Sequence, residues 1–88
     1  MSHVGLLDYF HLQKRFGFIS SILASGDVLR LYLSPRNVVF VAPGTVVGIG
    51  CGVVFDVAPP KRAGDLPFAI NVKIYEDEAA ASPEGERP

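Results

Sequence analysis

The densest group of side chains that could bind a ligand lies in residues 9–19, where aromatic and basic residues gather. Phe16 and Phe18 are separated by one residue, so on a β-strand both rings point to the same face. Lys14 and Arg15 precede them directly. Rings beside cations form a surface on which the bases of single-stranded nucleic acid stack while the cations attract phosphates. The alternative is that both rings are buried in the core, although Ile19 and the nearby Val and Leu residues are sufficient to fill a small core.

Catalytic and metal-binding patterns are missing from the sequence. His3, His11 and Cys51 do not have the spacing of a zinc site. No glycine run is followed by the Lys and Ser or Thr of a phosphate-binding loop. Ser20 and Ser21 lack the flanking glycines of a nucleophile elbow. We therefore expect neither enzymatic activity nor a metal or cofactor.

The elements that must position these residues are strands. Apolar and β-branched runs separated by turn residues predict strands at 4–11, 16–23, 28–33, 45–57 and 68–75, and no window shows a sustained helical stripe. Residues 38–41 fit either a short extra strand or a packed loop. About five strands with short connections in under 80 residues predict an all-β fold, a small closed or partly closed antiparallel barrel.

Three glycines fall at alternate positions of the strand predicted for residues 45–57. Gly48, Gly50 and Gly52 would share one face of a regular strand. Such a face indicates either a strand that coils tightly around a small barrel or a smooth floor for a ligand.

Length and charge divide the chain into a folded part and a tail. The 88 residues, 49% of them hydrophobic, suffice for one domain with one core. Residues 1–75 carry a net charge of +3 and residues 76–88 a net charge of −4, which together give the total of −1. We predict a folded domain over 1–75 and a disordered acidic tail over 76–88. The mildly basic domain permits a nucleic-acid partner without requiring one.

Residues 38–55 contain 18 residues without a formal charge, the lower limit for a membrane span. Pro43 and Gly44 interrupt this stretch, and its period of two fits strands better than a helix. We therefore predict no membrane association. A single Cys and the lack of a secretory signal in residues 1–10 favour a reduced, cytoplasmic location.

Two segments resemble the cold-shock domain family. Residues 5–19, GLLDYFHLQKRFGFI, align without a gap with the opening pattern Gly-x-Val-Lys-Trp-Phe-Asn-x-x-Lys-Gly-Phe-Gly-Phe-Ile of that family. Residues 67–72, PFAINV, resemble its closing pattern Pro-x-Ala-x-Asn-Val. The resemblance covers about residues 4–75 and is loose in the middle. The matching residues of the first segment are Gly5, Phe10, Lys14, Phe16, Gly17, Phe18 and Ile19.

The resemblance implies a five-stranded OB-type barrel over residues 1–75 that binds single-stranded RNA or DNA with little sequence preference, as an RNA chaperone or a regulator of transcription or translation. Bases in that family stack on aromatic residues of the first three strands, and Tyr9 occupies the position of the family's Trp. In the third strand, VLRLYLS aligned on its serine places Leu29 and Leu31 inside and Arg30 and Tyr32 outside.

Several positions depart from the family pattern. Asp8 replaces a Lys, Arg15 a Gly, His11 an Asn and Arg30 a Phe. An Arg guanidinium keeps a planar group that can stack on a base and pair with phosphate. Loops before the last strand of OB barrels flank the ligand groove. The predicted nucleic-acid-binding residues are Tyr9, His11, Lys14, Arg15, Phe16, Phe18, Arg30, Tyr32, Lys61, Arg62 and Phe68.

A rival hypothesis is a barrel that has lost nucleic-acid binding and serves as a protein-interaction or self-associating module. Asp8, Arg30 in place of an aromatic residue, the near-neutral total charge and the apolar stretch 38–55 favour it. A Val-rich strand that is exposed could form a homodimer by strand addition or exchange.

Overall fold

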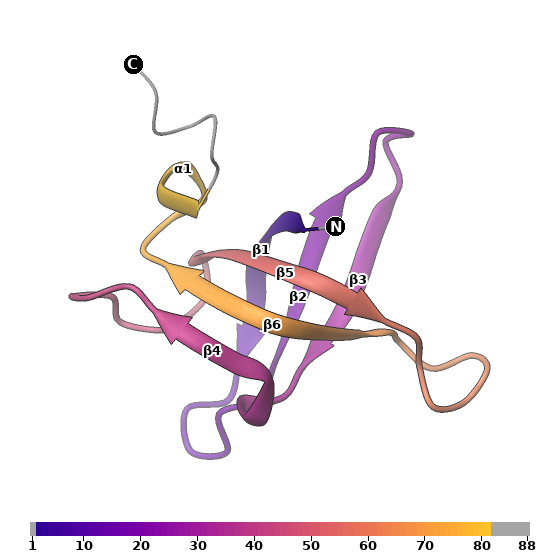
Figure 1. Cartoon of the computed structure of the whole chain (residues 1–88), viewed down its shortest axis with the longest axis horizontal. Coiled ribbons are helices and arrows are strands. Elements are labelled where there is room, and N and C mark those ends of the chain that lie inside the picture. The colour runs from indigo at the N-terminus through magenta and orange to yellow at the C-terminus, as the bar shows by residue number, and fades with distance from the viewer. Residues whose placement is uncertain (1, 82–88) are drawn as a thin grey trace.

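The computed structural model describes residues 2–81, and these residues form six β-strands and two short helices (Figure 1). The strands are β1 (His3–Phe10), β2 (Gly17–Ile22), β3 (Val28–Leu33), β4 (Val38–Val41), β5 (Gly52–Ala58) and β6 (Phe68–Tyr75). The helices are the 3₁₀ turn η1 (Pro35–Asn37) and the single α-helical turn α1 (Glu78–Ala81). The predicted all-β fold class is confirmed.

Five of the strands close into a barrel. Hydrogen bonds join the strands in the order β3-β2-β1-β5-β6-β4, and β3 also pairs with β6. This additional pairing closes β1, β2, β3, β6 and β5 into the predicted small OB-type barrel, whose β5 and β6 cross the direction of β1, β2 and β3 (Figure 1). The pairs β1–β2, β2–β3, β1–β5 and β5–β6 are antiparallel, whereas the closing β3–β6 pair is parallel.

Residues 38–41 form a short extra strand, which was one of the two predicted alternatives, and not a packed loop. This strand, β4, runs parallel to the second half of β6, from the pair Val38 and Val72 to the pair Val41 and Ile74. The first half of β6 pairs with β3. Both strands therefore share one edge of β6, with η1 between them.

Strand alternation separates the core from the outer face. Gly17 and Ile19 of β2 are buried, so Phe16 and Phe18 point outward, and Leu31 of β3 is fully buried as predicted. Leu29 is half-buried and packs against the core. The core consists of Leu7, Ile19, Leu31, Leu33, Cys51, Val53, Phe55, Ala69, Val72 and Ile74.

Three residues that match the cold-shock patterns have a backbone role in this fold. A Cβ at Gly5 would lie 2.5 Å from the Ser20 carbonyl oxygen, and one at Gly17 would overlap the Tyr9 carbonyl oxygen. Asn71 has a φ of 52°, a left-handed conformation that Asn tolerates better than most residues, and it donates a hydrogen bond to Asp56 at 3.0 Å. These positions therefore permit close strand pairing and a bend.

The strand predicted for residues 45–57 begins only at Gly52, so the prediction was wrong for residues 45–51. Gly50 has a φ of 97° and lies in a turn, and its N–H donates to the Leu7 carbonyl at 2.9 Å. Gly48 also lies outside any strand. The three glycines do not share a strand face, and no glycine floor for a ligand forms. Cys51 is a buried free thiol.

The segment predicted as a disordered tail differs from that prediction at its start. Asp77 accepts a hydrogen bond from the Ala80 N–H at 2.8 Å, which caps α1. Ala81 is only 6% exposed, and a Cβ at Gly52 would overlap the Asp77 carbonyl, so this turn packs closely against the start of β5. The apolar Ala-Ala-Ala run and this contact explain the local order. Residues 82–88 lie outside the described residues.

Candidate nucleic-acid interface

Six rings form one contiguous cluster on the outside of the barrel. We call this cluster the aromatic face. Neighbouring ring centroids lie between 5.2 and 6.4 Å apart, within the range of favourable aromatic pairs. Tyr9 is 42% exposed and the other rings are half-buried, so each ring keeps part of its surface open to a ligand. The members are Tyr9, His11, Phe16, Phe18, Tyr32 and Phe68.

Strand register places four of these rings in one row across the barrel. Tyr9 of β1 is paired with Phe18 of β2, Phe18 with Tyr32 of β3, and Tyr32 with Phe68 of β6. Directly paired residues on one sheet face have neighbouring side chains. The row therefore depends on both the antiparallel sheet and the parallel closure of β3 on β6.

An irregularity in β1 turns Tyr9 outward. Leu7 pairs with Ile19, but Tyr9 pairs with Phe18, so Asp8 is an extra residue between them. Regular alternation from the buried Leu7 would send Tyr9 into the core. The bulge exposes both Asp8 and Tyr9, because an inserted residue reverses the side-chain alternation.

His11 shapes the loop between β1 and β2. Its backbone N–H donates to the Phe16 carbonyl at 2.8 Å, and its ring Nδ1 accepts a hydrogen bond from the Lys14 backbone N–H at 3.1 Å. Its ring stacks on Phe16 at 5.2 Å and 22°. His11 thus extends the aromatic face and holds the turn that carries Lys14 and Arg15. Arg15 takes a φ of 63°, which favours glycine, the residue that the cold-shock pattern has here.

The predicted cations differ in how they relate to the aromatic face. Arg30 is exposed on β3 near Tyr32, and its guanidinium lies 3.9 Å from the Asp8 carboxylate. An exposed pair at this distance is weak and leaves Arg30 accessible. Lys14 is exposed, while Arg15 lines a separate apolar hollow with Phe10 and others.

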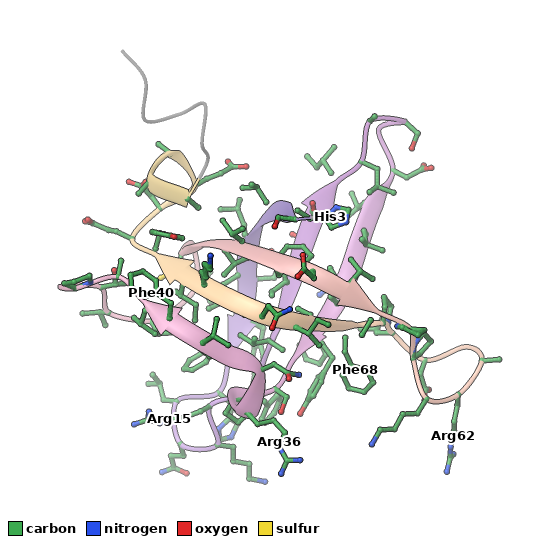
Figure 2. All side chains as sticks on the ribbon, in the orientation of Figure 1. His3, Arg15, Arg36, Phe40, Arg62 and Phe68 are labelled. Atoms are coloured by element: carbon green, nitrogen blue, oxygen red, sulfur yellow. The ribbon has the colours of Figure 1, made fainter. Side chains whose placement is uncertain are left out.

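Of the two basic residues in the β5–β6 loop, the structure brings only Lys61 to the aromatic face. Lys61 lines a groove together with Tyr32 and Phe68. Arg62 lies where this loop projects beyond the barrel, away from Phe68 (Figure 2).

Sequence reasoning missed part of this groove. Ser34, Arg36 and Asn37 also line it, and they lie on and just before η1. The pattern Ser-Pro-Arg-Asn indicates only a turn, so the sequence carries no signal that this turn lies beside Phe68. The parallel pairing of β3 with β6 brings the two segments together.

Within residues 2–81, no group of three His, Cys, Asp or Glu side chains is arranged to hold a metal ion. In the same residues, no helix has the length and apolar character that crossing a membrane requires. The buried Cys51 thiol lies 3.4 Å from the Val46 carbonyl, to which it donates.

Comparison with known proteins adds no family to this picture. No protein-family model matches the chain, and no curated protein matches it either. The resemblance to cold-shock domains stays a prediction. The function therefore has to be inferred from the geometry of the aromatic face and the residues around it.

Proposed function

We propose that this protein binds single-stranded RNA or DNA by stacking bases on the aromatic face, in the manner of a cold-shock domain. The observation that carries the proposal is the row of Tyr9, Phe18, Tyr32 and Phe68 across four strands. Successive bases of a single strand present successive π-faces, and a row of partly exposed rings matches that repeat.

The expected affinity is modest. Four rings at about 1–3 kcal/mol for each stacked base give a gross gain of roughly 4–12 kcal/mol. Loss of translational and rotational freedom costs at least about 4 kcal/mol. With some compensation from phosphate contacts, we expect a dissociation constant of micromolar order, about −8 kcal/mol.

Cations around the rings attract the phosphates. Lys14, Arg30 and Lys61 are exposed at different sides of the aromatic face. The mechanism is passive: binding stabilises the single strand, so paired RNA opens by mass action without ATP. An RNA chaperone or a regulator of transcription or translation would use this activity.

Fluorescence anisotropy of labelled pyrimidine-rich RNA and DNA oligonucleotides at several salt concentrations tests the proposal. We expect micromolar binding with a log–log salt slope of about −2, from about three phosphate contacts. Phe18→Ala should weaken binding by about tenfold or more. Phe40→Ala is the control, because Phe40 is 43% exposed but pairs with Tyr75 outside the aromatic face. Absence of binding at low salt, or equal losses in both variants, would contradict the proposal.

A second candidate function is a protein-interaction or self-associating module. Residues 39–49 expose several large apolar side chains.

 Residues 38–55 of the same region contain no charged residue. Exposed apolar surface of this kind marks many interaction sites. Light scattering over a concentration series tests this function: a doubled mass together with no retention of oligonucleotides would favour it over nucleic-acid binding. The exposed side chains concerned are Val39, Phe40, Val41, Val46 and Ile49.

A further inference from the structure

A groove opens next to the aromatic face, where β3 closes on β6. It contains Tyr32 and Phe68, whose rings meet edge to face at 5.7 Å. Ser34, Arg36 and Asn37 line it from η1 and the residue before it, and Lys61 lines it from the β5–β6 loop. Tyr32 and Phe68 belong to both the aromatic face and the groove. A nucleic-acid strand that crosses the aromatic face therefore reaches the groove without a break.

The groove has the charge that a phosphate needs. Arg36 and Lys61 are exposed, and within residues 2–81 neither of them forms an ion pair. The neighbouring depression, lined by Phe18, Tyr32 and Asp65, carries an acidic side chain instead. A phosphate bound next to Tyr32 and Phe68 is therefore repelled by Asp65 on one side and attracted by Arg36 on the other.

The groove also offers groups that can bind a base or a sugar. The side chains of Ser34 and Asn37 are half-buried, and in the described part of the chain neither makes a hydrogen bond. A hydroxyl donates or accepts, and an amide does both at once. These groups fit the polar edge of an unpaired base or a ribose hydroxyl.

We propose that this groove binds one further nucleotide of the single strand, beyond the bases stacked on the aromatic face. Arg36 and Lys61 hold its phosphate, Tyr32 and Phe68 contact its base or sugar, and Asn37 and Ser34 hydrogen-bond to its polar edge. The inference rests on the proposed function and adds a subsite, with Arg36 as a new binding residue.

The test compares Arg36→Ala with Arg62→Ala by anisotropy on a single-stranded oligonucleotide of about eight nucleotides, within the site sizes of OB folds. Both residues are exposed arginines, but only Arg36 lines the groove. Arg36→Ala should weaken binding about fivefold at low salt and make the salt slope shallower by about 0.7. Arg62→Ala should change the affinity by less than about twofold. Thermal unfolding of both variants checks that they fold.

Amide NMR of the wild-type protein during the same titration provides a second measurement. The signal of Asn37 should shift with the signals of Tyr32 and Phe68. Equal losses in the two arginine variants, or an unshifted Asn37 signal, would overturn the groove inference. If Phe18→Ala still weakens binding in that case, the proposed function survives. If the wild-type protein does not bind the oligonucleotide at all, the proposed function itself fails.

Discussion

The aromatic face and a second area both expose apolar side chains, but they are built differently. This second area, the β4 region, consists of β4 and Tyr75, the residue of β6 on which Phe40 packs. Tyr9 on the aromatic face is 42% exposed and Phe40 on β4 is 43% exposed, so exposure does not distinguish them. The aromatic face has six rings in contact and exposed cations beside them. The β4 region has one aromatic pair, Phe40 with Tyr75, and the exposed Lys73 of β6 is paired with Phe40.

This difference shows which property points to nucleic acid. Burying an exposed ring gains free energy with any apolar partner. A polyanion in addition needs cations next to the rings, because phosphates accompany every base. The aromatic face combines a row of rings with several cations, whereas the β4 region has one ring pair beside Lys73, so comparing the two regions tests whether that combination governs binding.

The largest effect is expected for Tyr32→Ala, compared with Tyr75→Ala. Tyr32 contacts Phe16, Phe18 and Phe68, so it joins the rings of the β2 side to Phe68 of β6. Its removal should cost about 2–3 kcal/mol of binding free energy, or about 30- to 150-fold in affinity. Tyr75 is also half-buried but lies in the β4 region, and its removal should leave affinity unchanged. Anisotropy measures both, and a similar loss in the two variants would remove the distinction between the regions.

A smaller loss is expected at the edge of the row. Tyr9→Ala should weaken binding by about 1 kcal/mol, roughly fivefold, because Tyr9 has ring neighbours on one side only. Tyr9→Phe keeps the ring and should bind within about twofold of the wild type. If Tyr9→Phe lost as much as Tyr9→Ala, the hydroxyl rather than stacking would explain the effect.

Asp8→Asn should strengthen binding. The Asp8 carboxylate lies 3.9 Å from Arg30 and beside Tyr9, where it opposes an approaching phosphate. Removing this exposed negative charge next to the aromatic face should gain about 0.5–1 kcal/mol of binding free energy, or about two- to fivefold in affinity at low salt. The gain should shrink as salt is added. The same substitution at Asp27, in the distant β2–β3 turn, is the control, and an equal gain there would indicate an effect of net charge alone.

The smallest effect concerns stability. Arg15→Gly should relieve the left-handed conformation at φ 63°, which costs a non-glycine residue about 1–2 kcal/mol, against about 0.5–1 kcal/mol for the added backbone entropy of glycine. The midpoint of thermal unfolding, followed by circular dichroism, should rise by a few degrees, about 2–6 °C. Arg15→Ala keeps the strained conformation, so its unfolding midpoint should not rise. Equal shifts in the two variants would show that the charge, not the conformation, sets the difference.

Much of the aromatic face could be predicted from the sequence, because it follows from local alternation. Phe16 and Phe18 flank Gly17, and one side of β2 must then be aromatic while the other is small and buried. The alignment of β3 placed Tyr32 outside and Leu31 inside by the same rule, and the structure confirms both positions.

Other features depended on contacts that the sequence pattern does not contain. The strand expected at 45–57 was too long, because the turn at Gly50 is stabilised by hydrogen bonds that Gly50 and Cys51 make with Leu7 in a distant strand. Residues 78–81 form a turn because Gly52 leaves room for Asp77 to pack against β5. Neither contact has a periodic signature along the chain.

The sequence by itself determined most of the strands and, where alternation is regular, the core side and the types of side chain on the outer face, because alternation is a property of neighbouring residues. Only the tertiary structure decided that Tyr9 points outward, through the extra residue Asp8 in β1. It also decided that Phe68 and Arg36 lie beside Tyr32, through the closure of β3 on β6. Register and closure depend on pairing between strands far apart in the chain, which no local pattern specifies.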